Sequence, residues 1–340
     1  MNEKEYLDFC EQLLEEVEKN IVETGLTIMD VALAATTKTN DPHAQSIVAK
    51  YKDEKHVFPA VYLTPLYHEY MNSNVSMNEL AVRILRTFEN NTDIKPNIEE
   101  SFMRPEYAQE HLYLQVISKV NNEALLERCS HLDITGTNLT AIPRWSIQDD
   151  TIGNASVLVS RELQSTLLKM TDEELLKTAK EATLETTTYT IQSMSESMRE
   201  MMYRSDMPKE MVDALTPIER EPEYLYVISN KQKAFGASAL LSKQILEETH
   251  KKLAEAFYII PSSLHEVLAV PKSYVRDPLE LQMLCQEVNA SHVSVEEQLG
   301  DDILYCDGKS LHVCNTLNDL HMIEDLHETN TASYGKGIRM

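Results

Sequence analysis

The chain has 340 residues, enough for two domains of ordinary size, and its 42% hydrophobic and 25% charged residues are typical of a folded protein. Its 55 acidic and 31 basic side chains give a formal net charge of −24 at pH 7. This excess of acids repels nucleic-acid phosphates and anionic lipid, so we expect no direct binding to either and favour a basic protein partner.

Cysteine usage and the N-terminus both predict a cytoplasmic protein. The five cysteines are an odd number scattered over a long chain, whereas a disulfide framework needs denser, paired cysteines, so we expect reduced thiols. The N-terminus reads MNEKEYLDF, with acids where a signal peptide carries basic residues before an apolar core. No segment approaches the ~18 apolar residues of a membrane span. We therefore expect a soluble protein without membrane contact.

The first 95 residues predict a small α+β unit. Apolar residues at helical spacing predict an amphipathic helix over 3–23. Segments with β-branched or alternating apolar residues then predict three strands, at 26–37, 46–52 and 57–63. Ser76 and Glu79 have the spacing of a capping box and predict a helix over 77–89. The expected order is helix, three strands, helix.

The rest of the chain predicts a larger C-terminal α/β unit over 96–328, so that the fold class as a whole is α+β. A polar stretch at 90–101 indicates a linker, and 329–340 a disordered tail. Helices are expected at 105–120, 171–182, 243–256 and from Asp277 onward. Strands are expected at 138–147, 154–160, 224–229 and 234–241, the last two as a pair. The Met-rich segment from Met194 to Met211 is typical of core or interface packing.

The glycine and histidine patterns exclude two common kinds of site. The eight glycines never fall into a dinucleotide fingerprint or a P-loop, so we expect no Gly-rich nucleotide site. His-Glu pairs occur three times, beginning at His68, His265 and His327. None has a second histidine four residues after the first, so the helical zinc motif is absent. No cofactor is expected.

The segment ILYCDGKSLHVC predicts a hairpin that carries three groups able to bind a metal, Cys306, His312 and Cys314. A two-residue Asp-Gly turn pairs Cys306 with Lys309 and places His312 and Cys314 on the opposite face. The side chains of Cys306, His312 and Cys314 then do not point to one place, and a closed metal site needs four ligands. A bulged three-residue turn would change this register, but no metal is the expectation.

The segment FYIIPSSLHEVLAVP, residues 257–271, has the clearest concentration of reactive side chains. Two apolar runs flank a six-residue interruption at 261–266 that carries hydroxyls, an imidazole and a carboxylate. A catalytic interpretation makes Ser262 or Ser263 the nucleophile and His265 its base. Glu266 would then orient the imidazole, and Asn230 would supply a further polar group from elsewhere in the fold.

A structural interpretation of the same turn is favoured over catalysis. Adjacent residues of an extended chain point to opposite sides, so His265 and Glu266 diverge unless the loop curls. The serine hydroxyls can instead satisfy turn backbone, and His265 can bond a neighbouring carbonyl. Polar loops on rigid strand pairs often carry function, so Asn230, Ser262, His265 and Glu266 are candidates for binding.

These segments resemble a bacterial family known as domain of unknown function 5688. The family's Ser/Thr-Asn-Lys strand, Gly-Ala step and Pro-Ser-Ser-x-His-Glu turn fall on Leu225–Lys231, Gly236–Ala237 and Ile260–Glu266. Residues 277–308 are also similar, as are the upstream pieces 57–85, 112–129 and 155–183. Relatives tend to carry His-Asn where this chain has Ser160–Arg161. The resemblance implies one coherent bacterial protein and no activity, because the family is named for lacking one.

Three functions are consistent with these observations. The leading one is a non-enzymatic protein-interaction or regulatory module whose acidic surface meets a basic partner. The second is a hydrolase or transferase centred on the Ser262–Glu266 loop, which needs those side chains in one concave pocket. The third is an acidic nucleic-acid mimic, which needs carboxylates in rows at phosphate-like spacing.

Overall fold

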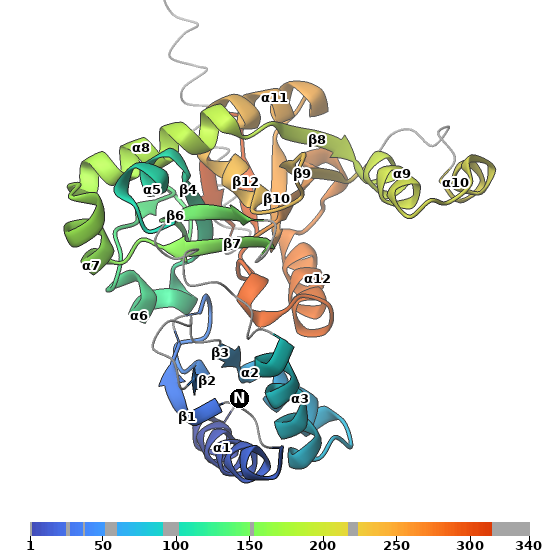
Figure 1. Cartoon of the computed structure of the whole chain (residues 1–340). Coiled ribbons are helices and arrows are strands. Elements are labelled where there is room, and N and C mark those ends of the chain that lie inside the picture. The colour runs from blue at the N-terminus through green and yellow to red at the C-terminus, as the bar shows by residue number, and fades with distance from the viewer. Residues whose placement is uncertain are drawn as a thin grey trace, which may run out of the picture. The chain divides into compact units, whose positions relative to one another are not determined.

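The computed structural model describes residues 2–24, 28–36, 38–51, 60–90, 102–149, 153–216 and 224–314. The chain divides into two compact units. Unit 1 comprises Met1–His111 and Trp145–Met170, and unit 2 comprises Leu112–Arg144 and Thr171–Met340. The fold is mixed α+β with antiparallel sheets, which confirms the predicted class (Figure 1). The predicted boundary near residue 95 and the predicted tail at 329–340 lie outside the described residues.

The N-terminal part of unit 1 is a three-stranded antiparallel sheet with helices, in strand order β1-β2-β3. Its elements are α1 (Glu3–Thr24), β1 (Ile28–Ala35), β2 (Gln45–Tyr51), β3 (Ala60–Tyr62), α2 (Thr64–Asn72) and α3 (Met77–Asn90). All were predicted except α2, which has Pro65 in its first turn. The capping box of α3 is confirmed, since Ser76 N–H donates to Glu79 Oε2 at 2.8 Å and Glu79 N–H to Ser76 Oγ at 3.3 Å.

Amphipathic helices hold this part of unit 1 together. Apolar residues at helical spacing place one face of α1 and one face of α3 in a common core with the sheet. The largest fully buried side chains of this core are Tyr6, Leu13, Ile47, Leu63, Leu80, Ile84 and Phe88. Burying such side chains stabilises the unit by roughly 1.5–3 kcal/mol each relative to exposure.

A buried polar cluster joins α1 to the start of α2. Thr64 Oγ1 lies 3.0 Å from the Tyr6 hydroxyl and donates to Asp41 Oδ2 at 2.6 Å. The Tyr62 hydroxyl donates to the same carboxylate oxygen at 2.7 Å, and Asp41 is only 5% exposed. Burial raises the pKa of Tyr6 to about 12, so its hydroxyl keeps its proton. Thr64 therefore bridges two groups that would otherwise be buried with fewer partners.

Unit 2 contains a six-stranded antiparallel sheet in the order β13-β12-β10-β11-β9-β8 (Figure 1). Its strands are β8 (Tyr189–Ser193), β9 (Tyr226–Asn230), β10 (Phe257–Ser263), β11 (Glu266–Pro271), β12 (Leu304–Cys306) and β13 (Leu311–Val313). Apart from the two helices of the Met-rich segment, the longer helices of this unit are α8 (Asp172–Thr186), α11 (Lys243–Leu253) and α12 (Pro278–Ser291). The shorter ones are η1 (Val120–Asn122), α6 (Glu123–Leu126), η3 (Gly236–Leu241), η4 (Lys272–Tyr274) and η5 (Val295–Glu297).

A second sheet of unit 2 has the order β4-β6-β5, formed by β4 (Leu112–Ser118), β5 (Leu132–Asp133) and the first half of β6 (Leu139–Asp149). Helix α8 packs along β4, and Leu114 N–H donates to Thr183 Oγ1 at 2.8 Å. The second half of β6 belongs to unit 1 and pairs with β7 (Gly153–Leu158). Unit 1 also holds α5 (Pro105–Glu110), α7 (Arg161–Leu163) and the π-helix η2 (Gln164–Leu168).

Two elements predicted for the C-terminal unit are wrong. The predicted helix over 105–120 ends at Glu110, and Leu112–Ser118 form β4, whose side chains are almost all buried. The backbone of this strand finds its hydrogen-bond partners in α8 and in the neighbouring strand. The periodicity of the local sequence does not reveal such partners. The predicted strand over 234–241 is the short helix η3, and β9 pairs with β8 and β11 instead.

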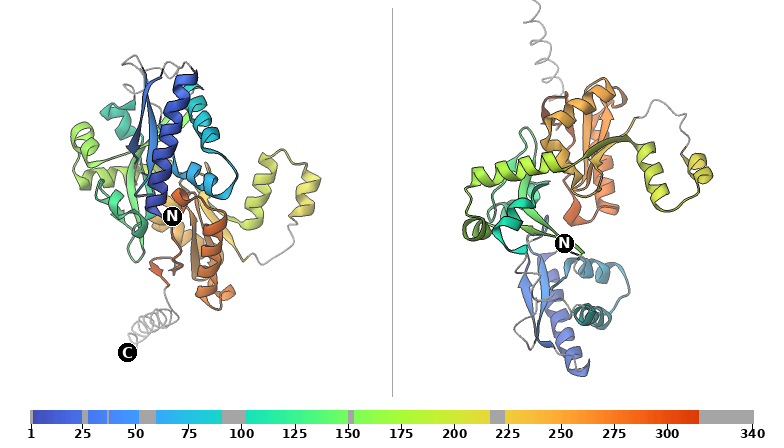
Figure 2. Two further views of the ribbon diagram at one scale, coloured as in Figure 1. Left: turned by 90° about the horizontal axis from the view of Figure 1, so that it is seen from below. Right: turned by 45° about the horizontal axis from the view of Figure 1, so that its top comes forward.

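The predicted Met-rich segment forms two short helices, α9 (Met194–Arg204) and α10 (Lys209–Leu215). They form a hairpin that extends away from the six-stranded sheet of unit 2 (Figures 1 and 2). No residue of α9 is buried, and only Val212 is buried in α10. The expectation that these methionines fill a core is therefore wrong, and an interface role stays a prediction.

Candidate functional site

The predicted Ser-His-Glu turn is the tip of the β10–β11 hairpin. The sequence predicts a six-residue turn, but only Leu264 and His265 lie between the strands. The two strands extend as far as the pair of Ser263 and Glu266. The pairing register shifts between Ile260 and Ser263, which is where the apolar run ends. The turn is therefore built into the sheet and is not a free loop.

The imidazole of His265 is held by two groups that do not belong to the turn. Its Nδ1 accepts the main-chain N–H of Phe235 at 3.2 Å, and its Nε2 lies 3.3 Å from Glu297 Oε1. Because Nδ1 uses its lone pair on Phe235, the ring proton sits on Nε2 and faces the Glu297 carboxylate. Neither ring nitrogen is left to take a proton from a serine.

The other candidate residues of the turn bond the backbone. Ser263 is buried, and its Oγ accepts the main-chain N–H of His265 at 3.1 Å. Buried Asn230 closes its own turn, since its Nδ2 donates to Ala234 O at 2.7 Å and its Oδ1 accepts Ala234 N–H at 3.2 Å. Ser262 and Glu266 are half-buried, and no hydrogen bond of the described residues joins either of them to the imidazole. This geometry favours the structural interpretation over the catalytic one.

The neighbouring loop at 229–237 packs directly on the turn. His265 O accepts hydrogen bonds from Ser229 Oγ at 2.7 Å and from Gly236 N–H at 3.1 Å. A Cβ at Gly236 would lie 2.5 Å from both His265 O and Ser229 Oγ, so only glycine allows this approach. The Phe235 ring also stacks at a tilt on His265, with centroids 5.6 Å apart. The Gly-Ala step and the Ser-His-Glu turn are thus two sides of one contact.

Through Glu297 the turn also holds the segment that follows η5. Leu264 N–H donates to Glu297 O at 2.8 Å, which adds a main-chain bond to the contact between His265 and the Glu297 carboxylate. Sequence reasoning assigned the orienting carboxylate to Glu266 and missed Glu297, which lies 32 residues beyond His265. Only the packing of the fold brings it there, so no local signal identifies it.

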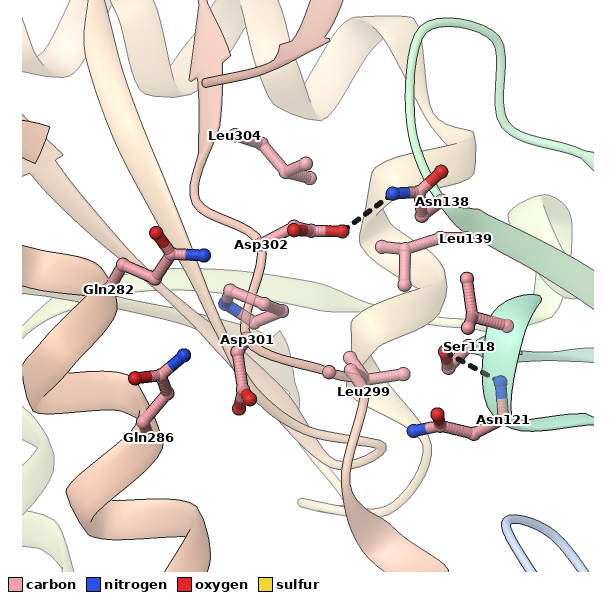
Figure 3. A pocket seen from close by; sticks show the side chains of 13 residues that line it. Ser118, Asn121, Asn138, Leu139, Gln282, Gln286, Leu299, Asp301, Asp302 and Leu304 are labelled. Carbon is pink, nitrogen blue, oxygen red and sulfur yellow. Dashed lines mark hydrogen bonds between the residues drawn. The ribbon is translucent and has the colours of Figure 1, made fainter. Parts of the chain in front are cut away.

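The segment after Glu297 forms one wall of a pocket in unit 2 (Figure 3). The pocket has a volume of about 320 Å³ and is lined by Ser118, Val120, Asn121, Asn138, Leu139, Pro261, Gln282, Gln286, Leu299, Gly300, Asp301, Asp302 and Leu304. Pro261 connects it to the hairpin that carries the turn. The polar side chains of its lining are carboxamides, one hydroxyl and two carboxylates, and none is basic. Sequence reasoning did not identify this pocket.

The two carboxylates of the pocket are fixed by amide side chains. Asn138 Nδ2 donates to Asp302 Oδ2 at 2.6 Å, and buried Asn289 of α12 donates to Asp301 Oδ1 at 2.8 Å. Asn289 also donates to Gly300 O at 3.2 Å, where a φ of +108° suits glycine. Among the described residues, no hydrogen bond reaches the second oxygen of either carboxylate. The segment that carries Asp301 and Asp302 is therefore held by Asn289 of α12 and by Asn138, which precedes β6. Through Glu297 it is also connected to the Ser-His-Glu turn.

The cysteines of the predicted hairpin do not form a metal site with His312. Cys306 pairs with Leu311, since four residues and not two connect β12 to β13, so the predicted register is wrong. Cys306 Sγ is buried and accepts Gly308 N–H at 3.4 Å, whereas His312 is exposed. The described residues hold no group of three His, Cys, Asp or Glu side chains placed to bind a metal ion.

All five cysteines are buried free thiols, as the sequence predicts. Burial raises the pKa of Cys10 to about 11 and those of Cys285 and Cys306 to about 12; Asp301 and Asp302 add to the effect at Cys285.

At pH 8 we expect the native protein to react with a thiol reagent about a hundredfold more slowly than the unfolded chain, because the thiolate is the reacting form. Ellman's reagent measures this, and Glu247→Cys, an exposed thiol, serves as the fast control. Rapid titration of any native thiol would contradict the burial.

Within the described part of the chain, no helix is both long enough and apolar enough to cross a membrane.

No curated protein and no solved structure matches the chain. A family model, that of DUF5688, described as a family of unknown function, matches residues 6–307. This match takes in both units, the Ser-His-Glu turn and the whole lining of the pocket. The chain therefore belongs to the DUF5688 family.

Proposed function

We propose that the protein is a protein-interaction module, not an enzyme, and that its unit 2 pocket receives a basic side chain of the partner. One observation carries this proposal: Asp301 and Asp302 both line a pocket of about 320 Å³ whose lining contains no basic residue. Charges that face a concave, partly desolvated site attract an opposite charge more strongly than charges on an open surface. A lysine or arginine of a partner is the group that this site fits.

The pinning of the wall supports a preformed binding site. Asp301 and Asp302 are each held by one amide, and the wall is tied to the turn through Glu297. A site whose side chains are fixed before binding loses less conformational entropy when the ligand arrives. His265 is then a positioning residue for the pocket, which gives the candidate turn a role without catalysis.

Binding of a fluorescein-labelled octalysine peptide, followed by anisotropy, tests the proposal. We expect the double variant Asp301→Asn/Asp302→Asn to bind about tenfold more weakly at 50 mM salt, because it removes two charges and keeps the shape. The matched control is Glu247→Gln/Glu248→Gln on α11, which removes the same charge from exposed positions outside the pocket. Equal losses in the two variants would show diffuse attraction to a −24 protein and would defeat the proposal.

In the described part of the chain, α1 carries a short row of carboxylates that bears on the acidic-mimic alternative. Exposed Asp8, Glu11, Glu15 and Glu18 follow one face of α1. The row spans about 15 Å at 1.5 Å per residue, whereas one turn of duplex DNA spans about 34 Å. Lys4 and Lys19 lie beside its two ends. This row is too short and too interrupted to carry a second function.

A further inference from the structure

The rim of the unit 2 pocket is apolar. Val120 belongs to the lining and is 65% exposed. On α12, Leu279 and Met283 share about 100° of helix surface with the pocket-lining Gln282 and Gln286, because residues three and four apart lie on one face. Leu279 is 40% exposed and Met283 is 69% exposed. Large apolar side chains exposed beside a polar pocket are typical of a binding surface.

The floor of the same pocket has amide side chains with unused hydrogen-bonding capacity. The side chains of Asn121, Gln282 and Gln286 make no hydrogen bond to the described residues. In Figure 3 the amides of Gln282 and Gln286 project from α12 toward the segment that carries Asp301 and Asp302. A carboxamide both donates and accepts, so it can hold the N–H and C=O groups of a peptide backbone. A simple cation would leave these groups unused.

We propose that the pocket binds an extended segment of a protein partner in which a basic residue and an apolar residue are two positions apart. In an extended chain such residues point to the same side and lie about 6.6 Å apart. The basic side chain enters the pocket toward Asp301 and Asp302, and the apolar one packs on Met283 at the rim. The free amides hold the backbone between them. This inference rests on the proposed function and adds a sequence requirement to it.

Three labelled nonapeptides with a Gly/Ser background test the motif. Their central residues are Arg-Ser-Leu, Arg-Ser-Ser and Ser-Ser-Leu, and binding to the full chain is measured by anisotropy. We expect Arg-Ser-Leu to bind about fivefold more tightly than Arg-Ser-Ser, because part of a leucine side chain is buried. Met283→Ser should remove that advantage, so that Arg-Ser-Leu binds no more tightly than Arg-Ser-Ser, which identifies the rim as its source.

The control variant is Leu284→Ser. Leu284 is 51% exposed like its neighbour, but one residue further along α12 turns it about 100° away from Met283 and from the pocket. It should change neither affinity. Equal binding of Arg-Ser-Leu and Arg-Ser-Ser to the wild type would overturn the motif and leave the basic site standing. If neither arginine peptide binds better than Ser-Ser-Leu, the proposed function itself fails.

Discussion

Replacing Gly236 with alanine is expected to lower the free energy of unfolding of unit 2 by about 3 kcal/mol, because the added methyl group has no room. Its Cβ would lie 2.5 Å from His265 O and from Ser229 Oγ, and 2.9 Å from Asn230 N, and two of these three atoms belong to the backbone. The turn would have to move away from η3. Native-state hydrogen exchange of the β10 and β11 amides measures the loss.

Gly300→Ala is the matched control for this change. At Gly300 the new Cβ meets nothing nearer than Ser118 Oγ at 3.8 Å, so only its φ of +108° costs stability. We expect about 1 kcal/mol from that backbone strain. Exchange rates in Gly236→Ala that match those of Gly300→Ala would show that the turn is not packed against η3.

Replacing Thr64 with valine is expected to destabilise unit 1 by about 2–3 kcal/mol, because it removes a buried hydroxyl and inserts a methyl group beside a buried carboxylate. Asp41 would lose the donor at 2.6 Å and keep Tyr62 at 2.7 Å, and the Tyr6 hydroxyl would lose the neighbour at 3.0 Å. Hydrogen exchange in β2 and α2 reports on this unit.

Thr64→Ser keeps the hydroxyl and removes only a methyl group, so it should cost less than about 1 kcal/mol. The difference between the two variants isolates the bridging role from the packing role. If serine is as damaging as valine, the packing of the methyl group contributes as much as the hydroxyl, and the bridging role is not the main source of stability.

The elements that could be predicted from the sequence are those with local signals. The capping box of Ser76 and Glu79 and the start of α12 after Asp277 both appear as expected, because each depends on residues within one turn of helix. The segment after Glu110 could not be predicted, since its conformation is decided by partners far along the chain. Leu114, for example, bonds Thr183, which lies 69 residues away.

The candidate site divides in the same way. The turn itself could be predicted because Ser263, His265 and Glu266 lie within four consecutive residues, and a polar interruption between apolar runs is visible in one sequence. The partner of the imidazole could not be found, because Glu297 is placed by the fold. The pocket has no local signal either, since its lining comes from five separate segments whose amides and acids look like ordinary surface residues.

The α9–α10 hairpin also has a consequence for oxidative damage. Met198, Met201 and Met211 are 39%, 63% and 55% exposed, and no core depends on them. Oxidants convert exposed thioethers to sulfoxides first, and a sulfoxide disrupts a protein mainly where the methionine was packed. These side chains therefore take up oxygen before any buried sulfur does, and the six-stranded sheet keeps its structure while they do so.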